Sequence, residues 1–217
     1  VPEGFTFCIK VPNSITLTHY YNKDKKAPLQ PNPYFLSVNL FQRFLDSIQP
    51  LSGHIGPLIF QFEYLNKKKM VNKESFFEQV HAFAEKLPKG FDYCLECRNA
   101  NYLGTDYFDF LSACSLHHVF LHGYYMEPIF GLYEKYRQQI KNLTVIRLHG
   151  PDRENIEKQT GNKWHQIVSA RDDDLTKLTV MLNDLRNREI RTFVFVNNHF
   201  EGSAPRTISR ITTLLAQ

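Results

Sequence analysis

The chain has 217 residues, of which 42% are hydrophobic and 22% are charged, a balance that is ordinary for a globular protein and a length that suits one large domain or two small ones. The formal net charge of +4 is mildly basic, which agrees with an anionic ligand, whereas nucleic-acid-binding proteins usually concentrate Lys and Arg on one face. No apolar run is long enough to cross a membrane and no targeting segment is recognised, so we expect a cytoplasmic protein without a membrane partner.

Six short runs combine β-favouring residues with an alternation of apolar and polar side chains, and we expect each to form a strand. They span residues 5–10, 57–64, 92–98, 118–122, 144–149 and 192–197. Successive runs lie about 25 to 50 residues apart, which is too far for hairpins and suits crossovers through helices.

Helical periodicity of apolar residues predicts helices between these strands. The predicted helices span residues 33–48, 73–87, 128–141, 174–188 and 205–216. Asn72 is expected to cap the second of them and Ser203 the last. Because strand and helix alternate throughout, we predict a parallel sheet with right-handed crossovers in a single α/β domain over residues 1–217.

Two long polar connections, residues 18–33 and 150–164, follow predicted strands and are therefore expected at the carboxyl-end rim of the sheet. The one dense basic run, Lys67-Lys68-Lys69, lies in a turn between a strand and a helix. We interpret it as a solvated turn.

Charged side chains gather at the ends of several predicted strands. Because side chains alternate along a strand, Glu96 and Arg98 share one side of their run. In the same way, Arg147 and His149 share one side of theirs. The carboxyl ends of strands are where α/β barrels and open α/β sheets place their sites, so the pattern predicts that these four side chains converge at one functional site.

Several short stretches, in order along the chain, carry a family resemblance. They are residues 5–10 with 15–19, 56–62, 95–98, 146–150 and 196–205, the last reading Val-Asn-Asn-His-Phe-Glu-Gly-Ser-Ala-Pro. In these stretches the chain resembles the YecE-like family, a domain of unknown function with a TIM-barrel-like fold. The resemblance implies a (β/α) barrel from which one or two amino-terminal βα units are missing here. Glu63 stands where the family usually has Pro.

The residues of this rim are expected to hold and convert a small ligand. Glu96 and His149 are the candidate catalytic residues, because histidine as a residue type titrates near neutral pH and a carboxylate can orient it or act as the base. Arginine suits a bidentate grip on a carboxylate or phosphate, so the basic residues favour an anion. The candidate substrate-binding residues are Lys10, His19, Gln61, Arg98, Arg147, Asn197 and Asn198.

Each of these residues also has a structural interpretation, and the sequence leaves it open. The charged side chains at the strand ends could form a salt-bridge layer that fills the barrel mouth. His19 could be a solvated loop histidine, and Asn197 and Asn198 could satisfy turn geometry.

A metal site was a further chemical alternative. Residues of ligand type lie on different strands, namely Glu96, His122, His149 and His199. No ligand spacing supports a site, and the neighbouring arginines would repel a cation, so we predict no metal; the sequence leaves the cofactor open. Cys94 and Cys97 have redox-pair spacing, but residues three apart on a strand face opposite sides and cannot share a disulfide.

The sequence therefore predicts a polar, anion-favouring pocket at the carboxyl-end rim. The favoured function is an acid–base enzyme, such as a hydrolase, isomerase or lyase, acting on a small anionic, sugar-like or nucleotide-like substrate. The alternative is a non-catalytic module that binds a phosphorylated ligand or nucleic acid. The substrate and the oligomeric state are left open.

Overall fold

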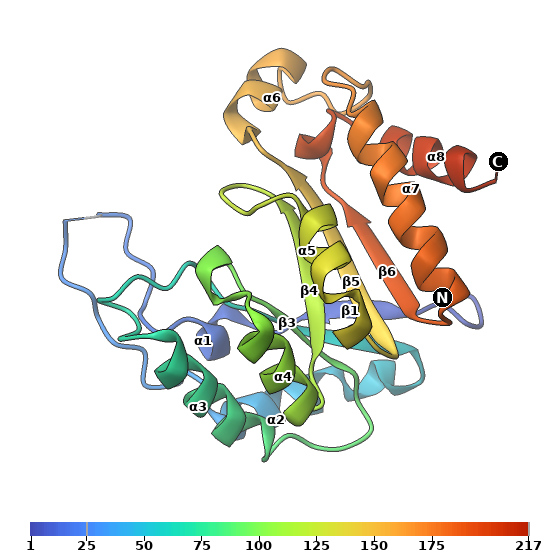
Figure 1. Cartoon of the computed structure of the whole chain (residues 1–217). Coiled ribbons are helices and arrows are strands. Elements are labelled where there is room, and N and C mark those ends of the chain that lie inside the picture. Colours follow the sequence, from blue (N-terminus) through green and yellow to red (C-terminus); the bar gives the residue numbers. More distant parts are fainter. Residues whose placement is uncertain (25, 217) are drawn as a thin grey trace. The chain divides into compact units, whose positions relative to one another are not determined.

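The computed structural model describes residues 1–24 and 26–216 (Figure 1). The chain divides into two compact units, Val1–His117 (unit 1) and His118–Gln217 (unit 2). Each unit contains parallel strands alternating with helices, and each is described by itself. The predicted single domain over residues 1–217 stays a prediction.

Unit 1 contains a parallel sheet in the order β1 (Phe7–Lys10), β2 (Ile55–Gln61) and β3 (Tyr93–Glu96). Lys10 is the register partner of Ile59, and Gln61 is the register partner of Glu96. Register partners on parallel strands point to the same side, and so do residues two apart on one strand. Lys10, Gln61 and Glu96 therefore share one face of this sheet near its carboxyl end.

Four aromatic side chains cover the opposite face of the unit 1 sheet. Phe41 and Phe83 come from helices α2 (Val38–Ile48) and α3 (Lys73–Ala84), and both contact Phe60 of β2 at ring-centroid distances of 5.4 Å. Tyr93 of β3 joins them, 5.9 Å from Phe60. Because Phe60 and Tyr93 point toward the helices, their neighbours Gln61 and Cys94 point away from α2 and α3.

The helix starts of unit 1 follow from side-chain caps. The Asn72 side chain accepts from the Ser75 N–H at 2.8 Å, which confirms the predicted cap of α3. Helix α2 begins later than predicted, at Val38, because Leu36 has a φ of 54° and the Ser37 hydroxyl caps the first turn by accepting from the Leu40 N–H.

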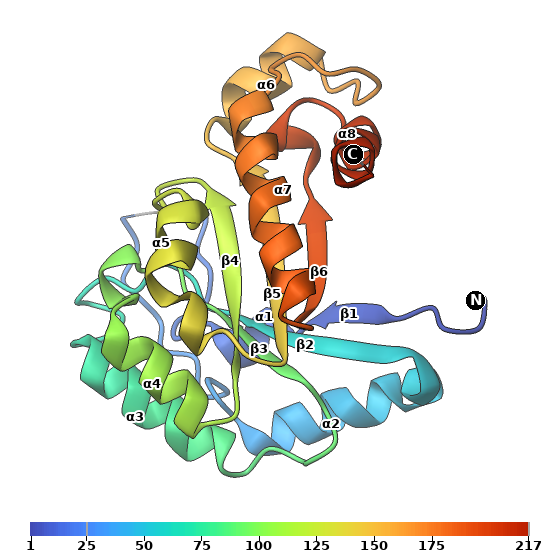
Figure 2. The same ribbon diagram turned by 45° about the vertical axis from the view of Figure 1, so that its right-hand side comes forward.

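Three short elements of unit 1 were not predicted, namely α1 (Asn13–Thr16), η1 (Gln49–His54) and η2 (Ala100–Tyr102). Helix α4 (Thr105–Ala113) was also missed, and it lies beside α3 in both views (Figures 1 and 2). In unit 2, the helix predicted over residues 128–141 ends earlier than expected. It spans Ile129–Tyr136, and a separate 3₁₀ turn follows at Arg137–Gln139.

Unit 2 contains a second parallel arrangement in the order β4 (His117–Gly123), β5 (Leu143–Gly150) and β6 (Arg191–Val196). Phe120 of β4 packs against Tyr133 of helix α5 (Ile129–Tyr136) at 5.9 Å, so this face of the sheet is covered by helices. Arg147 is in register with Leu121 and with Phe195, and it points to the opposite face.

The remaining elements of unit 2 complete the alternation. They are η3 (Arg137–Gln139), α6 (Arg153–Thr160), α7 (Asp172–Asn187), η4 (Asn198–Phe200) and α8 (Ala204–Leu215). Helix α7 runs along β6 (Figure 2). Helix α6 corrects the prediction of a polar connection over residues 150–164: the Asp152 carboxylate accepts from the Asn155 N–H at 3.0 Å, and Gly161 closes the helix in a left-handed conformation.

All six predicted strands are present, each within a few residues of its expected bounds. Parallel strands that alternate with helices fit a TIM-barrel-like fold, while the proposed loss of amino-terminal units stays a prediction. Among the described residues, no helix is both long and apolar enough to span a membrane.

Candidate functional sites at the carboxyl ends of the strands

Glu96 and Arg98 form an ion pair at the carboxyl end of β3. Arg98 Nε donates to Glu96 Oε1 at 2.8 Å, and the Glu96 side chain is fully buried whereas 27% of the Arg98 side chain is exposed. A buried carboxylate is costly unless it is paired, and this pair offsets that cost. The Arg98 guanidinium is therefore partly exposed, and the buried Glu96 carboxylate fixes its orientation.

Lys10 and Gln61 lie on the same face of the unit 1 sheet as Glu96. Lys10 is exposed at the end of β1, where its Nζ donates to the Asn13 Oδ1 at 2.6 Å, and Gln61 is half-buried beside Glu96. Unit 1 therefore brings Lys10, Gln61 and the Glu96–Arg98 pair to one face of its sheet.

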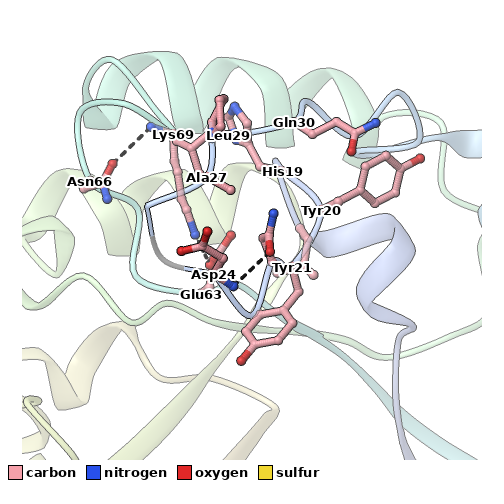
Figure 3. A pocket seen from close by; sticks show the side chains of 13 residues that line it. His19, Tyr20, Tyr21, Asp24, Ala27, Leu29, Gln30, Glu63, Asn66 and Lys69 are labelled. Atoms are coloured by element: carbon pink, nitrogen blue, oxygen red, sulfur yellow. Dashed lines mark hydrogen bonds and ion pairs between the residues drawn. The ribbon is translucent and has the colours of Figure 1, made fainter.

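His19 belongs to a different part of unit 1. It is half-buried, its Nδ1 lies 3.0 Å from the Thr18 Oγ1, and it lines a pocket of about 380 Å³ (Figure 3). Other lining residues include Glu63 and Lys69, which form an ion pair. Lys10, Gln61 and Glu96 do not line this pocket. Sequence reasoning selected His19 but missed this pocket, because the loop that forms it has no periodicity.

His149 lies at the end of β5 in unit 2, and its Nδ1 is 3.0 Å from the Tyr124 hydroxyl oxygen. The two rings are 5.1 Å apart. Tyr124 follows β4 directly, and its N–H donates to the Gly150 carbonyl at 3.2 Å. Sequence reasoning missed Tyr124, although its place immediately after a strand was a usable signal.

Gly150 allows the backbone of His199 to approach the end of β5 closely. It has a φ of 79°, and a Cβ at this position would collide with the carbonyl oxygen of His199. Glycine accepts both the positive φ and the approach of a neighbouring backbone at little cost. The residue after His149 therefore allows η4 to pack against the end of β5.

His199 of η4 takes part in a polar cluster with helix α6. Its Nε2 is 3.0 Å from Glu157 Oε1, and the same oxygen accepts from Arg153 Nε at 2.7 Å. Trp164 packs edge-on against the His199 ring at 5.1 Å. The hydrogen bond from Arg153, together with that from His199, lowers the pKa of the Glu157 carboxyl. Sequence reasoning missed Arg153, Glu157 and Trp164, because it treated their segment as an irregular connection.

Asn197 and Asn198 both bind backbone amides. Asn197 Oδ1 accepts from the His199 N–H at 2.9 Å, and Asn198 Oδ1 accepts from the Ala204 N–H at 2.8 Å. Ser203 is the N-cap residue of α8, as predicted, with Pro205 in the first turn, but its side chain makes no cap hydrogen bond; the Asn198 side chain accepts from the Ala204 N–H instead. These contacts fit the structural interpretation of the pair, and a substrate-binding role for them stays a prediction.

The weighed metal ligands are dispersed over different environments. His122 is buried and its Nε2 is 3.2 Å from Asp174 Oδ2, so this ring belongs to the helix-covered side of unit 2. Within residues 1–24 and 26–216, no group of three His, Cys, Asp or Glu side chains is arranged to hold a metal ion. Cys94 and Cys97 form no disulfide, and burial raises the pKa of the Cys97 thiol to about 12.

Parallel strands with intervening helices make this an α/β protein, and the arrangement fits a TIM-barrel-like fold. The whole chain, residues 1–217, matches the family described as "Protein of unknown function DUF72", and the chain belongs to this family. The resemblance to the YecE-like family is thereby confirmed, since both names denote the same family.

Solved structures of this family are similar to the chain. The DUF72 family protein TM1631 from Thermotoga maritima MSB8 is 19% identical with a TM-score of 0.68, and the match covers 100% of this chain and 75% of that one. A DUF72 family protein, EF0366, from Enterococcus faecalis V583 is 16% identical with a TM-score of 0.69, covering 100% and 76%. These likenesses support the fold alone. Among curated proteins, none matches the chain.

The four charged residues that are predicted to converge belong to two different units. Glu96 and Arg98 belong to unit 1, whereas Arg147 and His149 belong to unit 2. Within unit 1, Lys10, Gln61 and Glu96 share one face of the sheet. The convergence of all four stays a prediction.

Proposed function

We propose that this protein is an acid–base enzyme that acts on a small anionic or polyhydroxylated substrate, such as a sugar phosphate or a nucleotide. The observation that carries the proposal is the contact between His149 Nδ1 and the Tyr124 hydroxyl at the carboxyl end of β5. A tyrosine hydroxyl that contacts one ring nitrogen fixes the imidazole plane and can relay a proton. His149 is the proposed proton-transfer residue.

The basic residues supply the proposed anion preference. In unit 2, Arg147 precedes His149 by two residues on the same strand and is half-buried. In unit 1, Lys10 and Arg98 carry the positive charges, with Glu96 orienting Arg98 through their 2.8 Å hydrogen bond. Because Glu96 is already paired, we give it the orienting role first and proton transfer second. Gln61, His19, Asn197 and Asn198 are proposed to contact the uncharged parts of a substrate.

The test is consumption of a defined pool of sugar phosphates and nucleotides, followed by mass spectrometry. We expect at least one compound to be converted, and His149→Ala to lower that turnover by about 10²- to 10⁴-fold, the usual contribution of a general acid or base. Tyr124→Phe should lower it less. The matched control is His165→Ala, since His165 is an exposed histidine outside this cluster.

Two results would contradict the enzyme proposal. One is unchanged turnover in His149→Ala when circular dichroism shows a native fold. The other is a pool that remains intact with the native protein.

The alternative is a non-catalytic module that binds a phosphorylated ligand or nucleic acid. It is favoured by the existing partners of Glu157, His199 and Asn198, because side chains that already hold one another suit a fixed binding surface. It predicts that no compound is consumed and that Arg147→Ala weakens binding of a fluorescent oligonucleotide or nucleotide in a salt-dependent manner. Affinity that does not change with salt would contradict the nucleic-acid form of this alternative.

A further inference from the structure

A second histidine of unit 2 lies at the same strand end as His149, and the acid–base proposal gives it no role. His199 belongs to η4, and its carbonyl lies so close to Gly150, the residue after His149, that a Cβ there would collide with it. Asn197 Oδ1 accepts from the His199 N–H at 2.9 Å, which fixes this backbone. Both histidines are therefore held at the carboxyl end of β5.

Helix α6 supplies a carboxylate to His199. This helix lies beyond the carboxyl end of β5 in both views (Figures 1 and 2). Glu157 Oε1 is 3.0 Å from His199 Nε2, and Arg153 Nε donates to the same oxygen at 2.7 Å. The hydrogen bond from Arg153, and then that from His199, lower the pKa of the Glu157 carboxyl, so this group is ionised at neutral pH.

The contact with Glu157 decides which nitrogen of the His199 ring carries a hydrogen. An ionised carboxylate only accepts hydrogen bonds, so Nε2 must be the donor, and in the neutral ring Nδ1 then holds the lone pair. Nδ1 has no hydrogen-bond partner among the described residues, and it is not one of their buried polar atoms that lack a partner. Since 17% of the side chain is exposed, this nitrogen is open to a ligand.

A carboxylate that holds one ring nitrogen while the other stays open is the arrangement of a general base. The carboxylate orients the ring, and it stabilises the imidazolium that forms when the open nitrogen takes a proton. Trp164 packs edge-on against the His199 ring at 5.1 Å and restricts its movement further.

Arg153 connects this group to the pair of His149 and Tyr124. The pKa of the Arg153 guanidinium is raised mainly by Glu157 and further by Tyr124, so Arg153 lies near both. The Tyr124 hydroxyl is in turn 3.0 Å from His149 Nδ1. Two imidazoles with different partners, one a phenol and the other a carboxylate, suit opposite roles in proton transfer.

We propose that His199 is the base and His149 the acid of one proton-transfer pair, with Glu157 as the positioning residue of His199. The inference rests on the proposed function and adds a second catalytic residue to it. His199 Nδ1 forms a bond to the proton of a substrate C–H or O–H group, whose electron pair stays on the substrate. His149 gives a proton to another substrate atom, so the substrate keeps its number of protons, and exchange with water restores both rings.

The test measures turnover of the compound that the native protein converts from the pool of sugar phosphates and nucleotides. We expect His199→Ala to lower kcat by about 10²- to 10⁴-fold, the usual contribution of a general base. Glu157→Gln should lower kcat by about tenfold or more, because it keeps the imidazole and removes the charge that stabilises its protonated form. The matched control is Glu154→Gln, which changes an exposed glutamate of the same helix and should leave kcat unchanged.

Three further readouts separate proton transfer from a structural role. Added imidazole should raise the turnover of His199→Ala by about tenfold, because the free base replaces the missing ring. Glu157→Gln should cause no further loss in the His199→Ala background, because Glu157 acts through that ring. Glu157→Gln alone should leave KM and the free energy of unfolding unchanged, and since its side chain is 30% exposed, it keeps the test decisive if His199→Ala does not fold.

Native turnover in both His199→Ala and Glu157→Gln, with His149→Ala impaired, would overturn this inference and leave the proposed function standing. Additive losses in the double variant, without rescue by imidazole, would make the contact between His199 and Glu157 a structural one and would also overturn it. A pool that stays intact with the native protein would overturn the proposed function and this inference together.

Discussion

Two fully buried glutamates, one in each unit, are held by different kinds of partner. Glu96 ends β3, lies beside Gln61 and is held by Arg98, whose guanidinium is partly exposed at the rim. Glu201 follows η4 and accepts from the Arg171 N–H and the Thr207 hydroxyl, each at 2.7 Å.

Arg210 also donates to Glu201, so this carboxylate ties the start of α7 to helix α8. The two residues are equally buried, and their difference lies in the elements that their partners connect. Burial of a carboxylate is therefore not by itself a sign of function. The partners of Glu201 connect separate helices, whereas the partner of Glu96 lies two residues along the same strand end.

The largest effect is expected for Glu201→Ala, which should lower the free energy of unfolding by about 3 to 5 kcal/mol because it leaves buried donors without an acceptor. Urea denaturation followed by circular dichroism measures it. Asp172→Ala is the control, since Asp172 binds the same Arg210 but 76% of its side chain is exposed, and it should cost less than about 1 kcal/mol. Equal losses in the two variants would remove the distinction between buried and exposed partners.

A buried histidine gives unit 2 a pH dependence of intermediate size. Burial lowers the pKa of His118 to about 3, whereas histidine in an unfolded chain titrates near 6.5. Between these values the unfolded chain binds a proton that the folded chain does not, so stability falls as the pH falls from about 6.5 toward 3. The slope contributed by one such group is about 1.4 kcal/mol per pH unit.

Urea denaturation at several pH values tests this expectation. His118→Gln should flatten the dependence below pH 6.5, and the exposed His165→Gln should leave it unchanged. An identical slope in the native protein and in His118→Gln would contradict the assignment to His118.

The smallest effect is expected when Glu96 and Arg98 are replaced together by leucine. Removing both partners of a buried ion pair is often neutral or stabilising, so the free energy of unfolding should stay within about 1 kcal/mol of the native value. Arg98→Leu alone should be clearly less stable, since it removes the guanidinium that pairs with the fully buried Glu96 carboxylate. A double variant as unstable as the single one would show that Glu96 is a structural clamp like Glu201.

Much of the architecture was predictable because its causes are local. Alternation located all six strands, and the observed register places Gln61 and Glu96 on one face. The Asn72 cap was also readable, since a cap involves residues only three apart. Helix α6 was missed because its few apolar residues give no clear stripe, although Asp152 and Gly161 mark its two ends.

The candidate sites were only partly predictable. His149 was selected from its position on a strand, but its partner Tyr124 is 25 residues away in the chain. His199 and Glu157, which are 42 residues apart, meet because α6 packs on η4. No local pattern encodes such a distance, because it depends on how the elements pack.

The sequence by itself determined the order of strands and helices and the face on which each strand residue lies, because both follow from backbone geometry and near-neighbour side chains. The tertiary structure decided which polar groups became partners. Packing between segments distant in the chain joined Glu201 to Arg210, and it left Glu63 Oε1 buried without a hydrogen-bond partner among the described residues. Such contacts form only when burial of apolar surface brings those segments together.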